Sequence, residues 1–178
     1  KKWKGDTLIP QEINFDTNVE DILSDIKKAK IETIGKINSK YFEYPISRKQ
    51  AIQQLNYFCE HLLVHFDDYQ DAMHTDKIYL FHSRISFAMN TKIISPKEII
   101  DTVLETYRKQ QDAIDISQVE GFIRQILGWR EYMRGMYWML MPEYKKENFL
   151  DNKNKLPKFF WTGKTKMNCL KNAINNSL

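Results

Sequence analysis

The chain has 178 residues, a formal net charge of +4 at neutral pH, and 42% hydrophobic residues. A chain of this length can bury one substantial core, so we expect a single domain. No run of about eighteen uncharged apolar residues exists to cross a bilayer, which argues for a soluble protein rather than a membrane-spanning one. The net charge is too small to indicate nucleic-acid binding by itself.

Basic residues are concentrated in the last third of the chain. They are Lys145, Lys146, Lys153, Lys155, Lys158, Lys164, Lys166 and Lys171. This asymmetry permits a polyanionic partner. A solvated lysine surface is the usual explanation of such a pattern and stays open as the alternative.

The cysteines are Cys59 and Cys169. With so few cysteines and no signal peptide expected, a reducing cytoplasm is favoured over a disulfide scaffold. Cys59 lies among the apolar positions of an expected helix, so we expect it in the core. Because the sequence has neither a start methionine nor a clear terminal stop, we expect an excised piece of a longer chain.

Helix starts are marked by four capping boxes, in which two side chains satisfy amides that the first turn leaves without partners. The boxes are Thr17/Glu20, Ser47/Gln50, Ser95/Glu98 and Ser117/Glu120. Helical spacing of apolar residues predicts the corresponding helices over about 18–29, 48–65, 96–110 and 117–141. Pro96 suits a first helical position, and Pro142 ends the last of these helices.

The rest of the chain is expected to connect these helices. Residues 1–16 form an extended lead-in, residues 144–148 a short turn, and residues 151–158 a polar loop. Thr165 is expected to cap a last helix that carries Cys169. Since the sequence contains no alternating strand of useful length and no β-α repeat, the predicted fold class is all-α, an irregular multi-helix bundle.

The helix over 117–141 carries glycines at a spacing of seven residues, namely Gly121, Gly128 and Gly135. This spacing places them near one helix face, and each costs about 1 kcal/mol relative to alanine. Close packing against another helix is the simpler reason for such a cost. The alternative is that a flat group, a cofactor or a base, lies against exposed backbone.

Gln125 and Trp129 are one turn apart on the same helix, flanked by Arg124, Arg130 and Arg134. An amide that can bind a base edge therefore lies beside an indole on which a base can stack. Aromatic residues interleaved with arginine suit nucleic acid. The alternative is that Trp129 belongs to the core and that the arginines pair with neighbouring glutamates.

A second chemical pattern is the segment Tyr79-Leu80-Phe81-His82-Ser83-Arg84-Ile85-Ser86. It places two serines and an arginine around an apolar residue. Such hydroxyls near a helix start, with free backbone amides, suit a phosphate or pyrophosphate. The pattern alone is not specific.

Five short segments follow one another in a specific order. They are Tyr44-Pro45-Ile46-Ser47-Arg48, Phe66-Asp67-Asp68-Tyr69-Gln70-Asp71-Ala72-Met73, His82-Ser83-Arg84-Ile85-Ser86, Gly121-Phe122-Ile123-Arg124-Gln125-Ile126-Leu127-Gly128-Trp129-Arg130-Glu131, and Phe160-Trp161-Thr162-Gly163 with Cys169. In this order and at these separations they resemble the photolyase and cryptochrome superfamily. The resemblance is closest to its prokaryotic iron-sulfur branch, the deoxyribodipyrimidine photolyase-related proteins and bacterial (6-4) photolyases.

The resemblance implies a flavoenzyme that repairs ultraviolet-damaged DNA, in which reduced FAD absorbs blue light and passes an electron to a pyrimidine photoproduct flipped from the duplex. It implies cofactor-binding roles for Tyr69, Ser83, Arg84, Ile85, Ser86 and Phe122. It implies contacts with the lesion or the DNA for Gln125, Trp129 and Arg130. Trp161 resembles a tryptophan of flavin photoreduction, and Cys169 resembles the first ligand of a 4Fe-4S iron-sulfur cluster.

Some family features are changed or missing. Such a cluster needs four thiolates, and this chain has one candidate at the matching place. Asp67 stands where relatives usually have glycine, and Phe87-Ala88-Met89 replaces a stretch that usually contains proline. We therefore expect residues 1–43 to form a lead-in segment and first helix, and residues 44–178 to form the truncated N-terminal part of a helical FAD-binding domain.

Two other functions stay open beside a fragment of a repair enzyme acting on UV-damaged DNA in the cytoplasm. A cryptochrome-like flavin photoreceptor would bind FAD and change state in light without repairing DNA. A non-enzymatic helical nucleic-acid-binding module would bind no flavin, and its lysines would make nucleic-acid binding salt-sensitive. A fragment would also expose surfaces that the rest of a photolyase covers, so a homodimer or a loss of FAD binding is an expected consequence.

Overall fold

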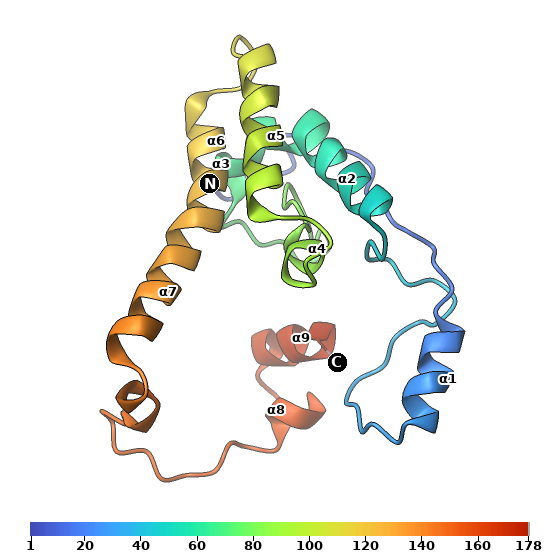
Figure 1. Ribbon diagram of the computed structural model, residues 1–178, viewed down its shortest axis with the longest axis vertical. Coiled ribbons are helices and arrows are strands. Elements are labelled where there is room, and N and C mark those ends of the chain that lie inside the picture. The colour runs from blue at the N-terminus through green and yellow to red at the C-terminus, as the bar shows by residue number, and fades with distance from the viewer. Residues whose placement is uncertain (178) are drawn as a thin grey trace. The chain divides into compact units, whose positions relative to one another are not determined.

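The computed structural model describes residues 1–177, in which helices are joined by irregular segments (Figure 1). Within these residues the only strand-like feature is an isolated antiparallel bridge between Thr17 and Phe42. The predicted all-α fold class is therefore confirmed. No helix of the described residues is both long and apolar enough to cross a membrane.

Contacts divide the chain into two compact units, which we describe separately. The first unit comprises residues 1–16 and 43–139, and the second comprises residues 17–42 with the chain from Leu140 onward. The first unit contains α2 (Arg48–Tyr57), η1 (Phe58–Leu62), η2 (Leu63–His65), α3 (Phe66–Tyr69), α4 (Ser86–Asn90), α5 (Pro96–Lys109), α6 (Ile116–Ile123), η3 (Arg124–Gly128) and most of α7 (Trp129–Leu140). The second contains α1 (Glu20–Lys28), η4 (Glu143–Lys146), α8 (Phe159–Thr162) and α9 (Asn168–Ser177).

The predicted long helix over 117–141 is present as three consecutive elements. α6 continues through a π-helical turn, η3, into α7 without a break in the helical path (Figure 1). The helix predicted over 48–65 is likewise continuous but irregular, because α2 passes into the π-helical turn η1 and then the 3-10 turn η2. Periodicity therefore located both helices but not their local windings.

Two of the four predicted capping boxes are confirmed. The Ser47 hydroxyl accepts from the Gln50 amide at the start of α2, and Ser95 does the same with Glu98 at the start of α5. In both boxes the side chain of the later residue returns a bond to the amide of the serine. Pro96 occupies the first turn of α5 as expected.

The other two capping boxes were wrong predictions. The Thr17 backbone pairs with Phe42 in the isolated bridge, so α1 begins later, and Asn18 Oδ1 accepts from the Glu20 amide at 2.9 Å. Before α6, Asp115 takes the cap position that was assigned to Ser117, and its carboxylate accepts from the Ser117 amide at 2.8 Å. In each case a nearby Asn or Asp side chain competes for the amides of the first turn.

The core of the first unit lies where η1, α3, α5 and α6 meet, and α5 packs beside α6 (Figure 1). Phe58 is fully buried and packs on Phe122, with ring centroids 4.6 Å apart, and edge-on against Phe66. Truncating a buried phenylalanine of this kind typically costs about 3–5 kcal/mol. Cys59 is buried beside it, as expected, and burial raises the pKa of its thiol to about 11.

The three evenly spaced glycines have different surroundings. A Cβ built on Gly121 would lie 2.5 Å from Asp67 Oδ1 and 3.0 Å from Asp67 Cβ, whereas nothing lies within 4 Å of a Cβ on Gly128 or Gly135. Close packing therefore explains Gly121 alone. The contact joins α6 to α3 and fixes the distance between them.

We expect Gly121→Ala to lower the free energy of unfolding by about 1–3 kcal/mol, because the new methyl group has no room against Asp67. Gly128→Ala is the matched control and should raise it by up to about 1 kcal/mol through helix propensity. Urea unfolding followed by circular dichroism measures both. Equal effects of the two substitutions would contradict the close-packing explanation.

A second prediction concerns pH. Glu98 pairs with Arg48 and accepts from the Ser95 amide, and these contacts lower the pKa of its carboxyl from 4.5 to about 2. A depressed folded-state pKa gives stabilisation that is present above the unfolded value and lost as the pH falls through the folded one.

The free energy of unfolding should therefore fall between pH 4.5 and pH 2 by less in Glu98→Gln than in the unchanged chain. Glu105→Gln, an exposed position on the same helix, is the control and should leave the slope unchanged. Chemical unfolding at a series of pH values gives this slope. If Glu98→Gln left it unchanged, the proposed linkage would be wrong.

Candidate functional site

A cavity of about 360 Å³ lies in the first unit between α3, the segment 82–85, α4 and the α6–η3 helix. We call it the serine-loop cavity. Its lining residues are Phe66, Gln70, Asp71, His82, Ser83, Arg84, Ile85, Ser86, Met89, Phe122, Gln125 and Ile126. It therefore brings together Ser83, Arg84, Ile85, Ser86, Phe122 and Gln125, which the sequence placed at a site from two distant segments.

The serine-loop cavity combines an apolar wall with uncommitted polar groups. Phe122 and Ile126 from the long helix face the same space as Ile85. The hydroxyls of Ser83 and Ser86 have no hydrogen-bond partner within residues 1–177, although the Ser83 carbonyl accepts from the buried Gln54 amide at 3.1 Å. Such a mixture, with a volume in this range, is typical of small-molecule sites.

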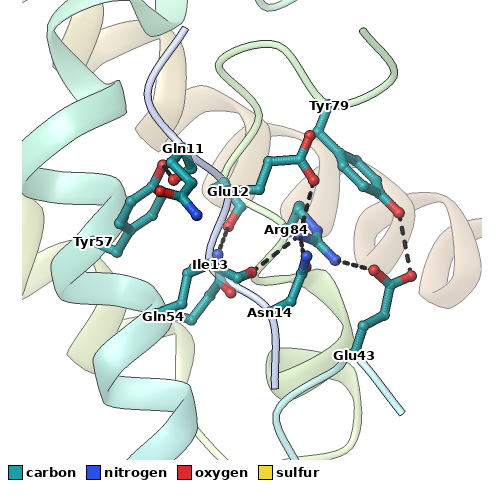
Figure 2. Close-up of polar contacts among 10 residues, drawn as sticks. Gln11, Glu12, Ile13, Asn14, Glu43, Gln54, Tyr57, Tyr79 and Arg84 are labelled. Atoms are coloured by element: carbon teal, nitrogen blue, oxygen red, sulfur yellow. Dashed lines mark hydrogen bonds and ion pairs between the residues drawn. The ribbon is translucent and has the colours of Figure 1, made fainter. Parts of the chain in front are cut away.

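The guanidinium of Arg84 contacts other residues of the protein (Figure 2). Its side chain is only 8% exposed and forms ion pairs with Glu43 at 2.9 Å and Glu12 at 3.8 Å. It also donates to Asn14 Oδ1 at 3.0 Å and to the Ile13 carbonyl at 3.3 Å. The cation thus ties the lead-in segment to residues 83–86, which we call the serine loop. Most of its N–H groups are already used for contacts within the protein.

Two further features mark Arg84 as a structural centre. Its guanidinium carbon lies 4.0 Å from the centroid of the Tyr79 ring, and the Tyr79 hydroxyl donates to Glu43. Its backbone has φ of +56°, a conformation that is uncommon outside glycine. The several acceptors around the side chain offset the cost of this backbone geometry.

Tyr69, the remaining expected cofactor contact, lies in the core. It is buried and stacks on Phe81 with centroids 5.0 Å apart, and its hydroxyl is 2.9 Å from Thr7 Oγ1. It does not line the serine-loop cavity. Its contact with Phe81 lies two residues before Ser83 in the chain.

A second cavity of about 480 Å³ adjoins the first along η3 and the start of α7. We call it the tryptophan cavity. Its lining residues are Gln70, Asp71, Gly121, Arg124, Gln125, Gly128, Trp129 and Tyr132. Gln70, Asp71 and Gln125 line both cavities, so the two spaces share a polar boundary.

Gln125 and Trp129 are joined by a hydrogen bond, in which the Trp129 indole N–H donates to Gln125 Oε1 at 3.1 Å. Trp129 is 60% exposed, so the alternative that it belongs to the core was wrong. The same alternative also predicted that the arginines pair with glutamates, and this is correct for two of them. Arg124 pairs with Glu120 at 3.9 Å and Arg134 with Glu131 at 3.8 Å.

Arg130 differs from these two arginines, since it is exposed and forms no ion pair with any residue that the structure describes. It follows Trp129 in the chain but does not itself line the tryptophan cavity. A charged side chain in that state is available to an external anion. The uncommitted cation and the exposed indole are the features that suit a nucleic acid.

Trp161 and Cys169 belong to the second unit, on α8 and α9, and both are exposed. The chain contains two cysteines, which are too few for a four-thiolate cluster. No group of three or more metal-ligating side chains occurs among the described residues. The residues present therefore do not fit a complete 4Fe-4S site.

Sequence reasoning missed six lining residues of the serine-loop cavity, and two of these, Gln70 and His82, contact each other. His82 Nε2 lies 3.0 Å from the Gln70 carbonyl, and since a carbonyl only accepts, this nitrogen carries the proton. Both residues stand inside the quoted segments, but no local pattern separates them from their neighbours. The signal that identifies them is their contact across twelve residues.

Comparison with known proteins gives the class: the chain belongs to the photolyase-type proteins. It is 35% identical to a (6-4) photolyase from Agrobacterium fabrum (strain C58) over 177 residues, which is 98% of this chain and 34% of that protein. The chain thus spans about a third of the length of that relative. It is also 37% identical over 109 residues to an uncharacterised protein of Acanthamoeba polyphaga mimivirus, covering 61% of this chain and 82% of that protein. No protein-family model matches the chain.

The Arg84 cluster generates a prediction. Arg84→Lys should lower the free energy of unfolding by about 1–3 kcal/mol, because a single ammonium cannot replace a planar fork that reaches several acceptors. Arg108→Lys, at an exposed position without an ion pair in the described chain, should change it little. Thermal unfolding and limited proteolysis within residues 1–16 measure the effect. Equal stability of the two variants would contradict a structural role for Arg84.

Proposed function

We propose that this chain is part of a light-driven, FAD-dependent DNA repair enzyme of the photolyase type, and that residues 44–178 form the first part of its helical FAD-binding domain. The observation that carries the proposal is the serine-loop cavity. It joins the serine segment to Phe122 and Gln125, and it does so in a chain that is 35% identical to a (6-4) photolyase.

The residues of the serine-loop cavity fit FAD in their chemistry. The unpartnered hydroxyls of Ser83 and Ser86 would donate to phosphate oxygens, and the side chains of Phe122 and Ile85 would pack on the apolar faces of the ring system. Arg84 and Tyr69 would act indirectly, by holding the loop in place. The buried Nε of Arg84 is the one nitrogen of that guanidinium without a hydrogen-bond partner in the described chain.

When bound and reduced, FAD supplies the light-driven electron that splits a pyrimidine photoproduct in such enzymes. The residues of this chain would bind and orient the damaged DNA. The Gln125 amide would bind the edge of a flipped base, Trp129 would stack on a base, and Arg130 would pair with a backbone phosphate. The exposure of Trp129 and the unpaired state of Arg130 support these roles.

The second unit would contribute through Trp161 and Cys169. We propose that Trp161 takes part in electron transfer to the flavin and that Cys169 is one ligand of a 4Fe-4S cluster whose other thiolates come from a longer protein. Ultraviolet-damaged DNA is the proposed partner and the cytoplasm the proposed location. A homodimer through exposed apolar surfaces is proposed for the isolated chain.

An absorption spectrum from 300 to 600 nm tests the proposal on this chain and on a version extended in both directions, each purified without oxygen. The extended version should show flavin bands and a broad iron-sulfur shoulder, and Cys169→Ser should remove the shoulder. If the extended version folds but stays colourless after incubation with FAD, the flavoenzyme proposal fails. A helical nucleic-acid-binding module would then be the better account.

The serine loop allows a sharper test. Ser83→Ala and Ser86→Ala should each weaken FAD binding to the extended version by about threefold to tenfold, as expected for loss of one hydrogen bond. Ser24→Ala, at an exposed position of α1, is the matched control and should leave binding unchanged. Quenching of flavin fluorescence measures the dissociation constants. Unchanged binding in both serine variants would place the phosphates elsewhere.

A further inference from the structure

A series of hydrogen bonds, each donated in the same direction, runs along the boundary that the two cavities share. The Trp129 indole donates to Gln125 Oε1 at 3.1 Å, Gln125 Nε2 donates to Gln70 Oε1 at 2.8 Å, and Gln70 Nε2 donates to Asp67 Oδ1 at 2.6 Å. The outer members lie on α7 and α3, so the series bridges the two helical segments. Gln70 is its central link.

The ends of this series determine its direction. An indole N–H can only donate, and a carboxylate can only accept. If either glutamine amide were turned over, a carbonyl would face a carboxylate or an N–H would face the indole N–H. Only one orientation of each amide therefore satisfies all three bonds.

The acceptor end is held rigidly. The Asp67 amide donates to Gln118 Oε1 at 2.8 Å, and the Gln118 side chain is buried. On its other side the Asp67 carboxylate lies against Gly121, where a Cβ would leave no room. Because Asp67 cannot move away, the amide of Gln70 has a fixed partner.

We propose that Gln70 is a positioning residue that fixes the orientation of the Gln125 amide and thereby sets the hydrogen-bond pattern offered to a base edge. After its two internal bonds, Gln125 retains one N–H donor and one carbonyl lone pair, and it lines both cavities. With the amide locked, this donor and acceptor keep a fixed order relative to the Trp129 ring. The base-recognition part rests on the proposed function, whereas the orientation of the amide does not.

His82 extends the role of Gln70. Its imidazole donates to the Gln70 backbone carbonyl at 3.0 Å. Gln70 therefore holds His82 through its backbone and Gln125 through its side chain. Of these two cavities, His82 lines the serine-loop cavity and Trp129 lines the tryptophan cavity. A substitution of Gln70 should therefore alter the positions of polar side chains in both cavities.

The orientation is tested by nuclear magnetic resonance of the ¹⁵N-labelled chain. The side-chain amide of Gln125, assigned by its loss in Gln125→Met, should exchange with solvent about threefold to tenfold faster in Gln70→Met than in the unchanged chain. Gln53→Met, the same substitution at an exposed glutamine of α2, is the control and should have no effect. Backbone resonances of the core report whether each variant folds, and Gln70→Ala replaces Gln70→Met if the latter does not.

Recognition is tested on the same proteins by titration with an ultraviolet-irradiated oligothymidylate, followed by tryptophan fluorescence. Gln70→Met should weaken binding about threefold to tenfold, toward the level of Gln125→Met, and Gln53→Met should not. Unchanged Gln125 amide exchange in Gln70→Met would overturn the inference whatever the binding result. Altered exchange with unchanged affinity would overturn its recognition part. If the unchanged chain and its extended, flavin-containing version both fail to bind the oligonucleotide, the proposed function fails while the exchange result still decides the orientation.

Discussion

The contact between α3 and α6 is the constraint on which both cavities depend. The buried Gln118 side chain accepts from the backbone of Asp67, and the missing side chain of Gly121 lets the Asp67 carboxylate approach α6. This approach brings Gln70 within bonding distance of Gln125 and lets the ring of Phe66 meet that of Phe122. If α3 and α6 were further apart, Phe66 would lose its contact with Phe122 and Gln70 would lose its bond to Gln125. The packing of the core and the geometry of the cavities therefore depend on the same contact.

The serine loop is held by a different force. A guanidinium that is almost fully buried requires compensation, and carboxylates that remain partly exposed can supply it at a lower desolvation cost than fully buried ones. Glu12 and Glu43 are of this kind, and they reach Arg84 from segments remote in sequence. The charge of the loop is therefore paired within the protein, while the hydroxyls of Ser83 and Ser86 have no partner in the described chain.

The sequence was informative wherever the determining contacts are local. Apolar periodicity and the Ser47 and Ser95 caps depend on residues within one turn, and both were predicted correctly. The caps at Thr17 and Ser117 failed because a backbone bridge and an aspartate two residues earlier changed the competition for the same amides. The serine loop and Phe122 were placed at one site through a family resemblance. The internal use of Arg84, the burial of Tyr69 and the link through Gln70 join residues tens of positions apart, so no window of sequence contains them.

The glycine spacing illustrates the same limit within a single helix. A repeat of seven residues keeps glycines near one face only while the helix turns at a constant rate. η3 is a π-helical turn, which holds extra residues per turn and rotates everything after it relative to α6. Gly121 packs on Asp67 before this turn, whereas Gly128 and Gly135 have open surroundings at its end and beyond it. The same rotation accompanies a change in burial, since α6 buries Gln118, Val119, Gly121 and Phe122 while α7 buries none of its residues. The π-turn carries Gln125 at the point where the helix changes from a buried element into an exposed one. At this point a side chain can be fixed by a bond to α3-adjacent Gln70 and still be open to solvent.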